Sequence, residues 1–284
     1  MKTQDEIQSK ILNIAQTDDR IRAVILNGSR ANAKVTPDAY QDYDIVFIVK
    51  DFDQFLNDRN WINLLGTPIL QQLPDEMELG KDENHKKFSF TFLMIFDDGN
   101  RIDLTLFPYE KFDIHFEIDS LTLVLLDKDQ LVKTIPEPSD VDYHIKRPTQ
   151  KQFMEVCNEF WWTATYVAKG LKRKEMIYAK EMMENVVRPM FWQLIEWHIG
   201  NEHDFKVSAG KSGKFADKFL SEALYKAVLK TYSDANLENN WDALFLMLKI
   251  FKNEQQQLAE KLNFVWNQDE AENSSKYIIK LYEI

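Results

Sequence analysis

Two apolar runs near the start of the chain decide its fold: Val24-Ile25-Leu26-Asn27-Gly28-Ser29-Arg30 and Asp42-Tyr43-Asp44-Ile45-Val46-Phe47-Ile48-Val49. Both are typical of buried β-strands. Because side chains alternate along a strand, Asp42 and Asp44 should point to the same face. Two carboxylates on one face repel each other unless a cation lies between them, and hard oxygen ligands suit Mg²⁺ carrying a nucleoside triphosphate. The Gly28-Ser29 turn can offer backbone N–H groups and a hydroxyl to phosphate oxygens. The pattern therefore indicates nucleotidyl transfer.

A third acid follows on a later strand. The β-forming run 88–96 leads into Asp97-Asp98-Gly99-Asn100, a hairpin signal, and the returning strand is Arg101-Ile102-Asp103-Leu104-Thr105-Leu106. Asp103 lies between apolar neighbours, so it should face away from the core, beside Asp42 and Asp44. Three carboxylates on adjacent strands can hold two metal ions roughly 3.5–4 Å apart. An Asp-x-Asp pair alone is equally typical of a solvated turn, but Gly-Ser before it and Asp103 after it favour the metal site. Asp97 and Asp98 are expected only to stabilise the turn.

These residues resemble the signature of the nucleotidyltransferase superfamily, which includes DNA polymerase β and the antibiotic nucleotidyltransferases. Two later segments are similar to the aminoglycoside 6-adenylyltransferases, which act on streptomycin: Glu159-Phe160-Trp161-Trp162 with Tyr166-Val167-Ala168-Lys169-Gly170-Leu171, and Gly210-Lys211-Ser212-Gly213-Lys214. The resemblance covers most of the 284 residues.

The resemblance implies transfer of AMP from Mg²⁺-ATP to the 6-hydroxyl of streptomycin, with release of pyrophosphate and resistance to the drug as the biological result. It implies nucleotide binding by Gly28, Ser29 and Arg30, and two Mg²⁺ ions bound by Asp42, Asp44 and Asp103. Asp103 would also draw the proton from the drug hydroxyl.

Composition limits the class of protein. The chain has 284 residues, 44% of them hydrophobic, which is ample for buried cores. The N-terminus lacks the apolar segment of a signal peptide, and no stretch approaches the length needed to span a bilayer, so a cytoplasmic protein without a membrane partner is expected. Cys157, the single cysteine, agrees with a reducing compartment and is expected to be a packing residue.

The charge balance bears on the partner. Thirty-five basic and 46 acidic residues give a net charge of −11, which disfavours nucleic acid and favours a polycation. Streptomycin carries two guanidinium groups and an amine, so an acidic cleft would attract it. Acidity that serves only solubility is the alternative. The sequence leaves the oligomeric state open.

The chain changes character half-way. A helix is expected near 4–15, strands near 22–27, 43–49, 88–96, 101–107 and 121–126, and a helix near 53–65. This is an α/β or α+β domain around a mixed sheet. The prolines near 136–138 indicate a linker, and after Pro148, well placed to open a helix, four or five helices follow. With the resemblance, the prediction is an α+β protein: a nucleotidyltransferase catalytic domain over 1–135, a linker over 136–147 and a helical substrate-binding domain over 148–284.

The helical half has its own candidates. Gly210-Lys211-Ser212 is similar to the end of a P-loop, but the required earlier glycine would fall at Phe205, so that motif is rejected. In related adenylyltransferases a lysine of the helical domain reaches the triphosphate. Lys211 or Lys214, opening a helix whose N-terminal amides favour anions, could do the same; a solvated basic turn is the equal alternative.

Three residues at i, i+4 and i+7 share one helix face: Glu155, Glu159 and Trp162. They could bind a guanidinium-bearing ring by salt bridge and stacking. Trp161 and Trp162, each taken alone, are more typical of a core.

Two other functions stay open. One is a nucleotidyltransferase with another acceptor, such as a lincosamide, a protein hydroxyl or a tRNA end, the last disfavoured by the acidic charge. The other is a non-catalytic nucleotide-binding module on the same fold, which would be expected to lose acids of the triad.

Overall fold

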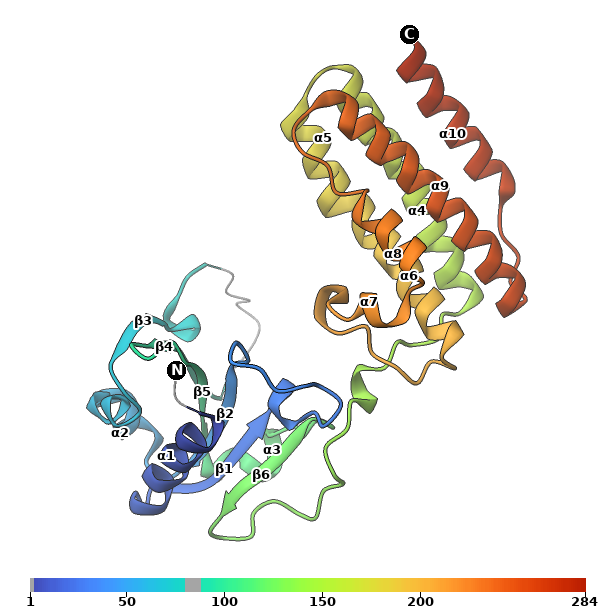
Figure 1. The fold of residues 1–284 in the computed structure, drawn as a ribbon. Coiled ribbons are helices and arrows are strands. Elements are labelled where there is room, and N and C mark those ends of the chain that lie inside the picture. Colours follow the sequence, from blue (N-terminus) through green and yellow to red (C-terminus); the bar gives the residue numbers. More distant parts are fainter. Residues whose placement is uncertain (1–2, 80–87) are drawn as a thin grey trace. The chain divides into compact units, whose positions relative to one another are not determined.

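The structure is a computed structural model that describes residues 3–79 and 88–284. The chain divides into two compact units, Met1–Asp142 and Tyr143–Ile284 (Figure 1). The division falls within the stretch 136–147 that the sequence predicts as a linker. A short 3₁₀ turn, Val141–Tyr143, lies at the boundary.

The N-terminal unit contains a six-stranded mixed sheet with the strand order β3-β4-β5-β2-β1-β6. Only the central pair, β2 and β5, is parallel; the other neighbouring strands are antiparallel. The predicted fold class, a mixed sheet with helices followed by a helical region, is confirmed. The strands are β1 (Ile21–Asn27), β2 (Tyr43–Val49), β3 (Pro68–Gln72), β4 (Phe90–Phe96), β5 (Arg101–Pro108) and β6 (Thr122–Asp127).

The hairpin between β4 and β5 forms as its residues predict. Gly99 adopts φ +82°, which suits glycine. The backbone N–H of Asn100 donates to Asp98 Oδ1 at 3.0 Å, so Asp98 stabilises the turn. The hairpin thereby fixes the register of β5 and with it the position of Asp103.

Two details of this unit differ from the sequence prediction. The helix expected over 53–65 is wrong as one element, because the extended residue Asp58 separates α2 (Phe52–Asn57) from a 3₁₀ helix, Asn60–Leu64. The edge strand β3 gave no signal, because almost all of its residues are exposed and no apolar alternation marks it.

The two faces of the sheet are covered unequally: the face with the larger apolar core is called the thick side and the other face the thin side. On the thick side, the helix α1 (Gln4–Thr17) and α2 cover apolar residues from five strands, and α1 starts at a capping box of Thr3 and Glu6. The thin side has a small core that includes Val46, Ile48 and Phe107, together with Phe112 of α3 (Phe112–His115). Asp44 and Asp103 share the alternation of this second set, so they lie on the thin side, beyond its apolar cover.

The C-terminal unit is helical throughout. It has more helices than the four or five expected, because short helices, α5, α7 and α8, accompany the four longer ones. The helices are α4 (Gln150–Lys172), α5 (Met176–Met182), α6 (Arg188–Glu202), α7 (Ala216–Phe219), α8 (Glu222–Leu229), α9 (Leu237–Leu262) and α10 (Gln268–Glu283).

The long helices pack around an aromatic core. Phe160 of α4 stacks on Phe251 of α9 with ring centroids 3.6 Å apart, and Trp161 donates to Gln255 Oε1 at 2.9 Å. Cys157 is buried in the same core, as expected, and burial raises the pKa of its thiol. No helix in residues 3–79 or 88–284 is long and apolar enough to cross a bilayer.

Two prolines mark the ends of helices in ways that the sequence only partly predicts. Pro148 does not open α4, because Thr149 is the N-cap and forms a capping box with Gln152. Pro189 lies in the first turn of α6, directly after a π-helical segment, Met183–Val187, that joins α5 to α6. A proline removes one N–H from the helical ladder, which accounts for the widened turn before it.

Candidate active site

The parallel pairing of β2 and β5 brings two of the predicted acids together. Asp44 and Asp103 are direct partners in the register, and Tyr43 pairs with Ile102 in the same ladder. Asp42 lies just before β2, two residues from Asp44 and therefore on the same side of the chain. The three carboxylates gather at one end of the two central strands.

Arg101, which was not predicted as a site residue, lies among these carboxylates. Its guanidinium donates to both oxygens of Asp103, from Nε at 2.8 Å and from Nη2 at 2.7 Å. Its Nη1 lies 3.5 Å from Oδ2 of Asp42. The sequence spacing could have indicated this position, because Arg101 precedes Asp103 by two residues on one strand and so lies on the same face.

The carboxylates still repel one another in spite of this cation. Burial, followed by repulsion from Asp103 and Asp42, raises the pKa of Asp44 to about 6. Burial is also the main cause that raises the pKa of Asp42, with Arg101 opposing it. A carboxylate with a raised pKa carries its negative charge at neutral pH at a cost in free energy, and added positive charge would reduce that cost.

The donor chemistry of this cluster fits Mg²⁺. All three side chains are carboxylates, the hard oxygen ligands that Mg²⁺ prefers. Burial and mutual repulsion raise the pKa of Asp44, so a cation bound there would stabilise its ionised form. In the described part of the chain, no three His, Cys, Asp or Glu side chains converge as a ready-made metal cluster. The Arg101 guanidinium contacts both Asp42 and Asp103, so a metal bound by these two carboxylates would compete with it for their oxygens.

The Gly28-Ser29 turn lies against the same carboxylates. Gly28 begins a 3₁₀ turn, Gly28–Ala31, with φ +74°, and a Cβ built on it would lie 2.3 Å from Oδ2 of Asp44. Only glycine therefore fits there. The Gly28 amide donates to the carbonyl of Leu121 at 3.2 Å, so it is not free for phosphate as the sequence analysis expected. Ser29 is partly exposed in the same turn.

Arg30 holds the loop that carries Asp42. Its guanidinium donates to the carbonyls of Gln41 (2.7 Å) and Asp42 (3.0 Å) and to the side chain of Gln4 (3.1 Å). It also lies over the ring of Tyr43, 3.8 Å from the centroid. These contacts make Arg30 a positioning residue for Asp42.

The predicted lysines lie on an irregular loop of the helical unit. Lys211 and Lys214 are both exposed. The expected α-helix does not start at Lys211, because the 3₁₀ turn Lys211–Gly213 contains left-handed Ser212, with φ 56°. The loop therefore offers two exposed cations and no regular helix N-terminus for an anion.

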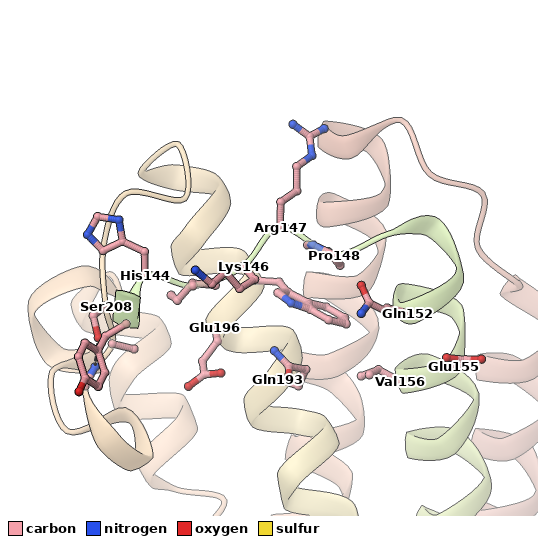
Figure 2. Close-up of a pocket in the computed structure, with 15 residues that line it drawn as sticks. His144, Lys146, Arg147, Pro148, Gln152, Glu155, Val156, Gln193, Glu196 and Ser208 are labelled. Carbon is pink, nitrogen blue, oxygen red and sulfur yellow. Dashed lines mark hydrogen bonds between the residues drawn. The ribbon is translucent and has the colours of Figure 1, made fainter. Parts of the chain in front are cut away.

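Of the three residues predicted to bind the acceptor, Glu155, Glu159 and Trp162 of α4, only one borders a cavity. Glu155 borders a cavity of about 510 Å³ in the helical unit, and Glu159 and Trp162 do not border it (Figure 2). The core interpretation holds for Trp161, which is 2% exposed, and is wrong for Trp162, which is 63% exposed and donates to Tyr166 Oη at 2.6 Å. The cavity also has lining residues that the sequence did not single out, among them Gln193 and Glu196 of α6.

Comparison with known proteins decides the family. A family profile described as streptomycin adenylyltransferase matches residues 1–281. The chain belongs to this family. Proteins named aminoglycoside 6-adenylyltransferase share its sequence along nearly the whole length: the one from Campylobacter jejuni is 38% identical, with 99% of this chain and 96% of that protein covered. The one from Bacillus subtilis is 36% identical, with 99% of each covered.

A third curated relative and one solved structure are also similar to the chain. The aminoglycoside 6-adenylyltransferase of Staphylococcus aureus is 33% identical, with 89% of each chain covered. A crystal structure of an aminoglycoside 6-adenyltransferase from Bacillus subtilis is 32% identical, covers 99% of both chains and has a TM-score of 0.49. The predicted relationship to the aminoglycoside 6-adenylyltransferases is confirmed.

Proposed function

We propose that this protein transfers AMP from Mg²⁺-ATP to a hydroxyl group of an aminoglycoside, the 6-hydroxyl of streptomycin, and so confers resistance to the drug. The observation that carries the proposal is the register pair Asp44–Asp103 beside Gly28, in a chain of the streptomycin adenylyltransferase family. That pair joins acids 59 positions apart in one polar patch, which a sheet built only for stability would not need.

The carboxylates would hold the metal in this proposal. Asp42, Asp44 and Asp103 would bind Mg²⁺, two ions in all, which when bound neutralise the triphosphate and steady the charge of the leaving pyrophosphate. The net charge of these three side chains explains why a metal is needed, because a bare triphosphate would be repelled by them.

The protein's own groups would position and activate the reactants. Gly28 gives the nucleotide close access to the turn, Ser29 offers its hydroxyl to phosphate oxygens, and Arg30 keeps the Asp42 loop in place. Asp103 would accept the proton of the acceptor hydroxyl as that oxygen attacks the α-phosphorus in line and pyrophosphate leaves. Lys211 or Lys214 would contribute a positive charge to the triphosphate.

The acceptor fits the charge of the protein. A net charge of −11 attracts a polycation and disfavours nucleic acid. Glu155, Glu159 and Trp162, all on the exposed face of α4, are the proposed acceptor contacts from the sequence pattern. The segment 1–135 would carry the transfer chemistry, 136–147 the connection and 148–284 acceptor binding, in a cytoplasmic enzyme.

One assay tests the function. Purified protein is incubated with labelled ATP, Mg²⁺ and a panel of aminoglycosides and lincosamides, and label on streptomycin is the expected result. Asp42→Asn should lower turnover roughly a thousandfold or more, because a lost metal ligand removes several kcal/mol of transition-state stabilisation. Label on a lincosamide alone would show another acceptor, and nucleotide binding without transfer would show a non-catalytic module.

A further inference from the structure

The helical unit contains a cavity of about 510 Å³ that borders its hydrophobic core at Trp197 and Ala209 and is otherwise lined largely by polar side chains. The segment Tyr143–Pro148 closes one side, the first turns of α4 and the middle of α6 form the walls, and Ser208–Gly210 completes the rim (Figure 2). A volume of this size holds a substituted sugar or cyclitol ring and lies within the range of small-molecule pockets.

Two polar side chains of α6 face this cavity together. Gln193 and Glu196 are three residues apart and therefore neighbours on one helix face. Both are partly buried. Within the described ranges, neither the Gln193 amide nor the Glu196 carboxylate has a hydrogen-bond or ion-pair partner. Burial raises the pKa of Glu196.

The basic residues of the lining do not neutralise Glu196. Lys146 and Arg147 are exposed. Figure 2 shows the Arg147 guanidinium directed away from Glu196, and Arg147 instead lies 5.9 Å from the ring of Phe205. A partly buried carboxylate without a cation destabilises the free protein, because its charge has lost water and gained no partner. A ligand that places a cation beside Glu196 would offset this loss of free energy.

We propose that this cavity is the acceptor pocket of the enzyme, with Glu196 as the anchor for a guanidinium or ammonium group of the aminoglycoside and Gln193 as a hydrogen-bonding partner for a neighbouring ring hydroxyl. The inference rests on the proposed function. It assigns the main cationic contact to α6, whereas the sequence pattern placed it on the exposed face of α4.

The chemistry of the lining matches this class of ligand. A guanidinium group donates two parallel hydrogen bonds to one carboxylate, and such pairs are about twice as strong as neutral hydrogen bonds. The Gln193 amide can both donate to and accept from a hydroxyl. Trp197, buried beside them, gives the floor an apolar surface against which a ring can lie.

The test measures drug binding directly, without ATP. Streptomycin is titrated calorimetrically into the wild-type protein, Glu196→Gln and Glu181→Gln; Glu181 is an exposed acid of α5 outside the cavity, so its variant makes the same charge change. Glu196→Gln is isosteric, and it should raise the Kd for streptomycin roughly 10–100-fold, as expected for loss of a charge-assisted pair. Glu181→Gln should stay within about twofold.

Transfer kinetics separate this inference from the proposed function. In Glu196→Gln, the KM for streptomycin should rise by about the same factor as the Kd, while the KM for ATP and kcat at saturating drug stay within about twofold. Normal streptomycin binding by Glu196→Gln would overturn the pocket assignment and leave the proposed function intact. Failure of the wild-type protein to adenylylate any aminoglycoside would overturn the proposed function. If streptomycin still bound tightly and Glu196→Gln still weakened that binding, the assignment of the cavity as a streptomycin-binding pocket would stand.

Discussion

Asp44→Asn should stabilise the metal-free protein although it removes a residue of the proposed catalytic cluster. The reason is that Asp44 is held between burial and two like charges, which raise its pKa from 3.8 to about 6. The neutral amide has nearly the same shape and none of this penalty. Residues selected for catalysis are often destabilising in this way.

The size of the effect follows from the pKa. A shift of about two units corresponds to roughly 3 kcal/mol above pH 6, and partial exposure of Asp44 to solvent reduces this to about 1–2 kcal/mol. For a unit of this size, that gain raises the melting temperature by roughly 2–8 °C.

The pH dependence has a definite sign. Because the folded protein binds the Asp44 proton more tightly than the unfolded chain, the wild type has this contribution in full below pH 3.8 and loses it as the pH rises through about 6. Asp44→Asn and wild type should therefore differ little near the lower value and reach their largest difference above the upper one.

The assay is thermal unfolding in a chelator between pH 4.5 and pH 8. Hydrogen exchange of peptides from β2 and β5 assigns the change to the N-terminal unit. Glu117→Gln, an exposed acid of the same unit, is the matched control and should show no such trend. Addition of Mg²⁺ should stabilise the wild type alone, because only it keeps the full ligand set. Equal stability of Asp44→Asn and wild type at pH 8 in chelator would refute the reasoning.

Three further predictions concern the same enzyme. Arg101→Gln should tighten Mn²⁺ binding, measured calorimetrically, and destabilise the metal-free protein by about 1 kcal/mol, because the guanidinium competes with the metal for Asp42 and Asp103; unchanged metal affinity would show that Arg101 is no competitor. Asp103→Asn should lower kcat by about 10²–10⁴-fold and change the KM for ATP far less, as expected for a proton acceptor; an unchanged kcat would move that role to an acid of the helical unit. The KM for streptomycin should rise with ionic strength while that for ATP changes less, because salt screens exposed charges beyond about 8 Å and close contacts much less; a drug KM independent of salt would contradict electrostatic attraction by the acidic surface.

Most strands of the N-terminal unit were predictable because the apolar residues of each strand follow a recognisable pattern along the sequence. The runs over 43–49 and 101–107 alternate or stay apolar over a full strand, and glycine marks the hairpin between β4 and β5. Local patterns of this kind need no knowledge of the partner strand. The edge strand β3 and the break at Asp58 were not predictable, since exposed residues leave no apolar pattern.

The chemical groups of the candidate site can be identified from the sequence alone: Asp42, Asp44 and Asp103, with a glycine turn before them. Their chemistry depends only on residue type and short spacing, and both are visible along the chain. The family relationship was likewise readable from these residues and the two later segments.

Which of these groups lie in contact depends on the folded chain. The parallel register places Asp44 against Asp103 and sets Arg101 between Asp103 and Asp42. Helix packing leaves Glu196 without a cation beside a cavity. The physical reason is that strand register and helix contacts join residues far apart in the sequence, so neither a local period nor a spacing rule encodes them.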